Sequence, residues 1–138
     1  MSRIIKTDGV AQERKRLIRA VVLALRELMA QTKPDSMTRD LAAFIVLALR
    51  QVSDNVDRTV GPWEKRGYWL KADRFRLDWD WTRFLGDEMA GYLRDDDWGG
   101  VAMVAAKIAG KLSDVEVPKR HRLGTPWVGA WEVFRSKK

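Results

Sequence analysis

The sequence predicts an all-α protein: a single-domain bundle of four to five helices with a long central helix over about residues 63–94. Apolar residues recur at helical spacing along almost the whole chain, and runs that alternate apolar with polar residues are few. A chain of 138 residues with 46% hydrophobic residues can also bury one core without disulfide bonds. We therefore expect residues 1–138 to form one domain, with a loose basic tail over Ser136-Lys137-Lys138.

The first helix is predicted over about residues 9–31, with Thr7 or Asp8 as its N-terminal cap. Apolar residues share one face of it, and basic residues share the opposite face. The helix should end before residues 33–36, where Pro34 breaks the chain and Asp35-Ser36 can cap the next helix.

The second helix is expected over about residues 37–58. Its centre at residues 41–49 is apolar on nearly every side, which is typical of a helix that lies inside a bundle. An apolar seam continues to Val60, where Gly61-Pro62 is expected to stop the helix because proline disrupts a helix interior. Pro62 can then lie in the first turn of a third helix.

The third helix, over residues 63–94 and bent near Gly67, carries two apolar seams. The first seam contains Leu70, Leu77, Trp81, Phe84, Leu85 and Tyr92. The second seam contains Phe75, Trp79, Thr82, Gly86, Ala90 and Leu93. A helix with two apolar seams needs two packing partners. We expect the first seam to face the core, and the second to face either another helix of the same chain or a second copy of the protein.

Two shorter helices are predicted near the C-terminus. Asp95-Asp96-Asp97 should end the third helix and cap a fourth over about residues 98–112. Small residues cover much of this fourth helix, so it can pack closely against a neighbour. A loop is expected over residues 113–125, and Pro126 should begin a last short helix with aromatic residues on one side, namely Trp127, Trp131 and Phe134.

The composition argues against several classes of protein. The chain has no cysteine, which excludes disulfides, thiolate metal sites and cysteine nucleophiles, and its one histidine, His121, cannot build a multi-histidine metal site. Its longest apolar run has nine residues, whereas a membrane-spanning helix needs roughly 20. The N-terminus also lacks an apolar signal segment. We expect a soluble, cytoplasmic protein with no cofactor, no metal and no membrane partner.

Positive charge is concentrated at the two ends of the chain. Residues 1–34 and residues 99–138 each carry eight Lys/Arg and three Asp/Glu, or +5, within a net charge of +7. Such clusters can bind phosphate groups without reading sequence, although surplus charge on a solvated face is the simpler alternative. The candidate nucleic-acid-binding residues are Lys15, Arg16, Arg19, Arg26, Lys119, Arg120 and Arg122.

The stretch from Trp63 to Trp81 contains four of the seven tryptophans, and nearly every aromatic residue in it has a charged neighbour. On helical seams, tryptophans are mostly core residues. Trp69 lies off both seams, between Arg66 and Arg76, so it could stack on a guanidinium, on a nucleobase or in an intersubunit contact. The candidate interface or stacking residues are Trp69, Phe75, Trp79, Gly86 and Leu93.

The remaining polar patterns do not indicate a catalytic site. Asp73, Asp80 and Asp87 recur every seven residues with Arg76 and Arg83 between them, which predicts an ion-paired solvated helix face. No glycine-rich phosphate loop has a strand–loop–helix frame. The sequence therefore favours a non-enzymatic binding or assembly subunit, with nucleic-acid backbone or a larger nucleoprotein assembly as its partner. A structural homo-oligomer is the alternative, and a carboxylate-based enzyme is the least favoured.

Overall fold

The computed structural model describes residues 2–137, with side chains from residue 9 onward, and the part it describes contains five helices and no strand. The prediction of a small all-α bundle is confirmed. None of these helices combines the length and the apolar character that crossing a membrane requires. The helices are α1 (Ser2–Met29), α2 (Ser36–Lys65), α3 (Trp69–Arg94), α4 (Trp98–Lys111) and α5 (Ala130–Ser136).

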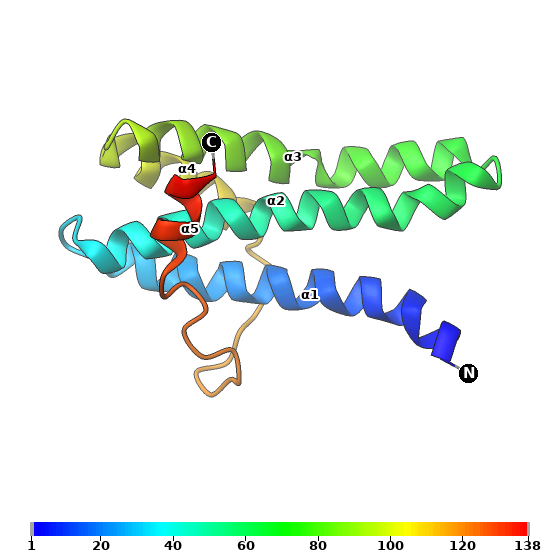
Figure 1. Cartoon of the computed structure of the whole chain (residues 1–138), viewed down its shortest axis with the longest axis horizontal. Helices are drawn as coiled ribbons and strands as arrows, with labels where there is room; N and C mark the ends of the chain where they lie inside the picture. The colour runs from blue at the N-terminus through cyan, green and yellow to red at the C-terminus, as the bar shows by residue number, and fades with distance from the viewer. Residues whose placement is uncertain (1, 138) are drawn as a thin grey trace.

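Helix α2 is the central helix of the bundle. Figure 1 shows α2 between α1 on one side and α3 on the other, and α2 packs against both of them and against α5. Helix α4 packs mainly on α3 and also touches α1. The predicted central helix over residues 63–94 is therefore corrected in two respects: α3 begins only at Trp69, and α2 occupies the centre.

The second helix does not stop at Gly61-Pro62, because α2 continues through Pro62 to Lys65. Packing on α3 holds this last turn in place despite the proline. The Trp63 ring meets Phe75 edge to face at 5.4 Å, and the ammonium of Lys71 lies 4.2 Å from the Trp63 ring centre. Aromatic and cation–π contacts of this kind offset the hydrogen bond that a proline removes from a helix.

The chain reverses at Gly67, where the sequence predicted only a bend. Gly67 has a φ of +83°, a left-handed conformation that glycine adopts at little cost. Its N–H donates to the Glu64 carbonyl at 3.0 Å, and the Tyr68 N–H donates to the Trp63 carbonyl at 2.9 Å. This pair of bonds is a Schellman motif, which ends α2 and lets α3 return along it.

The N-terminal boundaries of the first two helices differ in how well they were predicted. Helix α1 begins at Ser2, so neither Thr7 nor Asp8 is its cap, and the side chains of both lie outside the described residues. The cap of α2 is confirmed at Asp35, whose carboxylate accepts the Thr38 N–H at 3.0 Å. The Thr38 hydroxyl accepts the Asp35 N–H in return, which completes a capping box.

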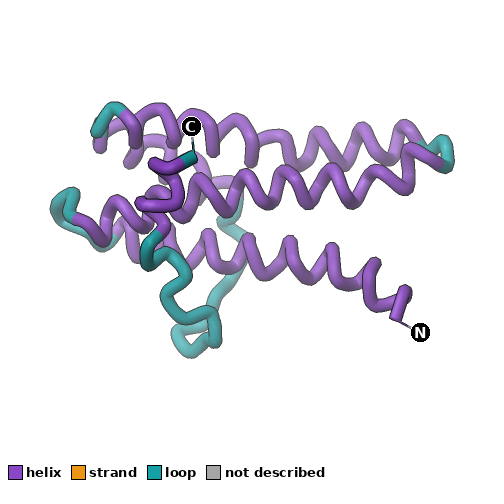
Figure 2. Tube along the Cα trace, viewed as in Figure 1, coloured by secondary structure: helices purple, strands orange, loops and turns teal. Residues whose placement is uncertain are grey.

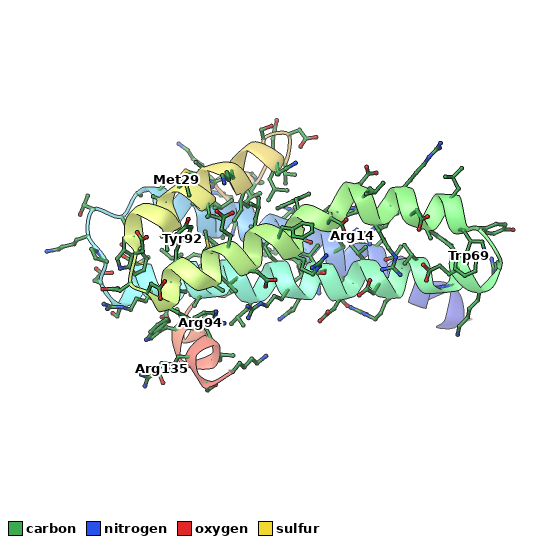
Figure 3. The ribbon with its side chains drawn as sticks, turned by 90° about the horizontal axis from the view of Figure 1, so that it is seen from above. Arg14, Met29, Trp69, Tyr92, Arg94 and Arg135 are labelled. Atoms are coloured by element: carbon green, nitrogen blue, oxygen red, sulfur yellow. The ribbon has the colours of Figure 1, made fainter. Side chains whose placement is uncertain are left out.

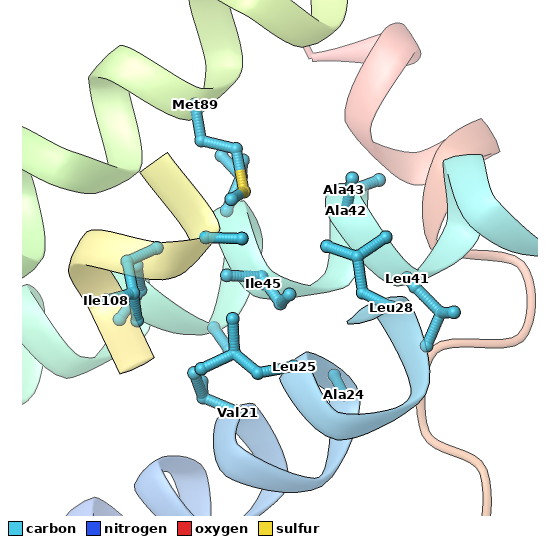
Figure 4. Packing of buried hydrophobic residues seen from close by; sticks show 14 of the residues in the cluster. Val21, Ala24, Leu25, Leu28, Leu41, Ala42, Ala43, Ile45, Met89 and Ile108 are labelled. Carbon is cyan, nitrogen blue, oxygen red and sulfur yellow. The ribbon is translucent and has the colours of Figure 1, made fainter. Parts of the chain in front are cut away.

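The core lies where α1, α2, α3 and α4 meet. Figure 4 shows Val21 and Leu25 of α1 pointing toward Ile45 of α2, with Met89 of α3 and Ile108 of α4 closing the same cluster. Nearly all side chains of residues 41–49 are buried, which confirms the predicted interior position of this segment.

The second seam of α3 has one of the two partners predicted for it, whereas the prediction that the first seam faces the core is only partly right. The second seam faces α2 of the same chain: a Cβ on Gly86 would lie 3.4 Å from the Leu49 Cβ, and Leu93 is 2% exposed. The first seam is divided: Leu77 is 72% exposed and Phe84 is 56% exposed, whereas Trp81, Leu85 and Tyr92 are half-buried and pack against the core. The small residues Gly86 and Ala90 explain why the second seam packs on α2, because they let the backbones of α2 and α3 approach closely.

Ion pairs join α3 to α2 rather than forming a stripe along α3 itself. Arg76 pairs with Asp57 and with Glu64 of α2, and Asp87 lies 3.5 Å from Arg50 of α2. The expected pairing of Arg76 within the aspartate stripe is therefore wrong. The antiparallel hairpin places α2 carboxylates nearer to Arg76 than its own helix neighbours are.

The connection between α3 and α4 confirms the predicted role of the three aspartates. Asp96 adopts a φ of +55°, and the Asp97 N–H donates to the Tyr92 carbonyl at 2.9 Å as α3 ends. The Asp97 carboxylate then accepts the Gly100 N–H at 3.0 Å and caps α4. One short segment thus ends a helix and begins the next.

The last helix begins later than predicted and takes its cap from another helix. Residues 126–129 form a turn, and α5 begins at Ala130 after Gly129, whose φ is +84°. The carboxylate of Asp40 in α2 accepts the N–H groups of Gly129 at 3.1 Å and Trp131 at 2.9 Å. The predicted loose tail is helical at Ser136, and residue 138 lies outside the described residues.

Replacing Asp40 with alanine should loosen α5 without unfolding the bundle. The change removes a negatively charged acceptor for two N–H groups at the start of α5, and loss of a helix cap costs about 1 kcal/mol. We expect faster hydrogen exchange at residues 129–136 than in the unmodified protein. Asp54→Ala, which changes an exposed carboxylate on the same helix, is the control and should leave that exchange unchanged.

A candidate anion-binding hollow

The candidate site depends on the long loop between α4 and α5, which Figure 2 shows in teal. The loop is fixed at both ends. Near its start, the Arg26 guanidinium donates to the Val117 carbonyl at 2.6 Å, and the Val117 side chain is buried. Near its end, Trp127 is buried in the core cluster. These anchors hold the middle of the loop against α1.

A hollow of about 730 Å³ lies between this loop, α1 and the first half of α2. It brings together two basic clusters that are about a hundred residues apart in sequence. Lys15, Arg16 and Arg19 come from α1, and Arg122 comes from the loop together with His121. The remaining lining residues are Gln12, Leu17, Ala20, Phe44, Leu123 and Pro126.

The cations of the hollow have no carboxylate partner among the described residues. Within residues 9–137, Lys15, Arg16, Arg19 and Arg122 take part in none of the salt bridges, and no carboxylate lines the hollow. Some arginines elsewhere pair with carboxylates, namely Arg39, Arg50, Arg58, Arg76 and Arg135, whereas others, such as Arg66 and Arg74, do not. The hollow therefore offers positive charge that is available to an anionic ligand.

His121 adds an imidazole ring to the hollow. Its Nδ1 atom accepts the Leu123 N–H at 3.2 Å, so in the neutral ring the proton is placed on Nε2. The bond also holds the loop in a tight turn beside Arg122. A neutral imidazole that donates from Nε2 can hydrogen-bond to an acceptor on a bound ligand.

Three of the predicted phosphate-binding residues lie outside the lining of the hollow. Arg26 donates to the Val117 carbonyl, so it positions the loop. Lys119 and Arg120 are exposed on the loop just before His121 and add positive charge beside the hollow. The structure therefore gathers four of the seven predicted residues around one space.

Sequence reasoning missed the apolar lining of the hollow. Phe44 belongs to the run at residues 41–49, which predicted an interior position, yet its side chain is only half-buried and reaches the hollow. Leu123 carried no signal and Pro126 predicted only the start of the last helix, because nothing in a loop sequence indicates which helix the loop crosses. Leu17 lies on the apolar face of α1 and packs at the edge of the core.

A second polar cluster surrounds Arg14, on a different part of the α1 surface. The Arg14 guanidinium donates to Asn55 Oδ1 at 2.8 Å and to Thr59 Oγ1 at 2.9 Å. It also lies over the rings of Phe75 at 5.0 Å and Trp79 at 5.7 Å. Burial lowers the pKa of Arg14. Neutral oxygens of α2 and aromatic faces of α3 thus hold this cation, and Figure 3 labels the position of Arg14.

Asn55 connects this cluster to the backbone of α1. Its side chain is fully buried, and its amide donates to the Val10 carbonyl at 2.9 Å and to Glu13 Oε2 at 3.3 Å. Hydrogen bonds from Arg58, and then from Asn55, lower the pKa of Glu13. All of these contacts tie α1 to α2, so the cluster has a structural role.

The candidate interface residues do not share one surface. Gly86 and Leu93 are buried against α2, while Phe75 and Trp79 are half-buried beneath Arg14. Trp69 alone is well exposed, at 60%, and Figure 3 shows it at the turn between α2 and α3. The set therefore divides into four packing residues and one exposed aromatic residue.

The geometry of the basic hollow has to be interpreted without help from related proteins. The chain matches no protein-family model, no curated protein and no solved structure.

Proposed function

We propose that the protein is a non-enzymatic binding or assembly subunit that contacts a nucleic-acid backbone at the basic hollow. One observation carries the proposal: cations from both ends of the chain line a single space that contains no carboxylate. A solvated surface with surplus charge has no need to bring two distant basic clusters together. A polyanion with charges repeated along its length would contact α1 and the loop at the same time.

Binding through these cations would be strongly salt-dependent. Each lysine or arginine that neutralises a phosphate releases condensed counterions, so the affinity falls as salt rises. Contacts to phosphates carry no sequence information, and the protein would therefore bind many sequences with similar affinity. A chain with a net charge of +7 would also be attracted to nucleic acid over a distance set by the ionic strength.

The variant Lys15→Gln/Arg19→Gln/Arg122→Gln should bind a fluorescent oligonucleotide at least tenfold more weakly than the unmodified protein. Loss of each phosphate contact should also reduce the slope of log affinity against log salt by about one. Fluorescence anisotropy at several salt concentrations measures both quantities. Glutamine is polar but uncharged, so the change acts mainly on charge.

The matched control is Lys33→Gln/Arg74→Gln/Lys111→Gln. It removes the same amount of positive charge from exposed positions outside the hollow. An equal loss of affinity in both triple variants would show that net charge, rather than the hollow, attracts nucleic acid. Absence of any binding at low salt, or binding that is insensitive to salt, would contradict the proposal.

A structural homo-oligomer is the second candidate, and the exposed part of the first seam of α3 favours it. Leu70, Leu77 and Phe84 recur every seven residues and are 64%, 72% and 56% exposed. A repeated apolar row on a helix surface is typical of helix pairing between subunits. Light scattering at tens of micromolar should then report an oligomer that Leu77→Glu converts to a monomer. A monomeric unmodified protein would rule this candidate out.

A further inference from the structure

The floor of the basic hollow is apolar, although its rim is charged. Leu17 of α1, Phe44 of α2 and Leu123 of the loop are half-buried and pack against the hydrophobic core, and all three line the hollow. Pro126 lies beside them. A site that only held phosphate groups would have no use for such a floor, because phosphate oxygens seek hydrogen-bond donors and cations.

We propose that the hollow receives one unpaired base of a single-stranded nucleic acid, with the base on the Phe44 side of the floor and the flanking phosphates on the rim. The inference rests on the proposed function and adds to it the class of nucleic acid that is bound. A nucleobase has flat faces that stack on aromatic rings, whereas its sugar–phosphate backbone is anionic. The hollow presents both kinds of surface within one space of about 730 Å³.

Duplex nucleic acid fits this arrangement less well. In a duplex the bases are paired and stacked inside, so a base can enter a hollow only after it is extruded from the stack, which costs free energy. A single strand exposes its bases without that cost. Gln12 and His121 of the hollow add polar groups that can hydrogen-bond to the edge of a base.

Other anions share only part of this chemistry. An acidic peptide would satisfy the cations Lys15, Arg16, Arg19 and Arg122, but it would offer the aromatic floor no flat ring. An anionic bilayer would need apolar side chains that protrude, whereas Phe44 is half-buried, packs against the core and lines a concave space. The combination of ring, concavity and basic rim favours a base with its backbone.

The test compares three ligands of equal length: a thymidine oligonucleotide, the same strand with its bases removed at internal positions, and a duplex. The unmodified protein should bind the intact strand about tenfold more tightly than the abasic strand or the duplex, since stacking of one base contributes about this much. Phe44→Leu should lose most of that preference. Its affinity for the abasic strand, and its salt dependence, should stay unchanged because the rim is intact.

Two further variants control for folding and for aromatic content. Phe44→Tyr keeps an aromatic ring at the floor and should keep the preference for the intact strand. Tyr68→Leu removes an exposed aromatic side chain from the turn between α2 and α3, outside the lining of the hollow, and should change none of the three affinities. Circular dichroism melting of each variant confirms that it remains folded at the assay temperature.

The outcomes separate this inference from the proposed function. If intact and abasic strands bind equally well, or if Phe44→Leu weakens both to the same extent, the base-binding inference is wrong while backbone contact at the rim survives. If polyglutamate or vesicles of anionic phospholipid displace the intact strand at equal charge concentration, the inference also fails. If no nucleic acid binds at low salt, both proposals fail together.

Discussion

Replacing Gly100 with alanine is expected to destabilise the protein by about 2 kcal/mol, within the range for overpacked sites. A Cβ at this position would lie 2.3 Å from the Tyr92 Cδ1 atom and 2.4 Å from its Cγ atom. The ring of Tyr92 rests directly on the backbone of α4, and Figure 3 shows it between α3 and α4. The ring or the helix must therefore move, and either movement disturbs the packing of α4 on α3.

Gly110→Ala is the matched control, because it adds the same methyl group to the same helix where nothing lies within 4 Å. Alanine favours a helix more than glycine does, so this variant should be as stable as the unmodified protein or up to about 1 kcal/mol more stable. Urea unfolding followed by circular dichroism gives both free energies of unfolding. Equal stability of the two variants would show that Tyr92 does not hold α4 in place.

Replacing Asn55 with alanine is expected to lower the free energy of unfolding by about 3 kcal/mol. Asn55 is fully buried and supplies an acceptor to the Arg14 guanidinium and a donor to the Val10 carbonyl. A hydrogen bond to a charged group contributes about 1.5–3 kcal/mol, and a buried group that loses its partner costs more than the average bond. Gln51→Ala, an exposed amide one turn earlier on α2, should change stability little.

A second change at Arg14 tests whether the cost comes from the buried charge. In Asn55→Leu/Arg14→Met, apolar groups replace both the amide and the cation, and such replacements of buried polar groups are often nearly neutral. We expect the double variant to recover part of the stability that Asn55→Leu alone loses. A double variant that is less stable than either single variant would contradict this explanation and indicate a larger role for the aromatic contacts of Arg14.

The sequence predicted where the helices of this fold lie better than it predicted which face of each helix is buried. Helical spacing and the Pro34-Asp35 break located α1 and α2, because these signals are local. Proline at position 62 was misleading, since contacts of Trp63 with α3 decide where α2 ends. The two seams of α3 were both apolar, and only the close approach at Gly86 distinguishes the buried one.

The sequence predicted the charged residues of the candidate site, but it did not predict the hollow that these residues line. Lys15 and Arg19 were visible because their helix has a basic face, and Arg122 because it lies in a basic run. Their convergence depends on the path of a loop, which Arg26 and Trp127 fix through contacts far apart in sequence. Phe44 lines the site only because the loop passes beside it, so no local sequence pattern could have indicated its role.

The hydrogen bonds that Asp40 accepts from the start of α5 make the shape of the hollow depend on whether α5 is docked on the bundle. One wall belongs to the bundle, whereas the other belongs to a segment that is held by a few bonds from Arg26 and Asp40 and by Trp127 and Phe134 in the core. That segment can detach while α1 to α4 remain packed, since local openings need less free energy than global unfolding. The apparent affinity for a ligand is then reduced by the fraction of molecules in which the loop and α5 are detached from the bundle. A ligand and the C-terminal helix should therefore stabilise each other, although they never touch.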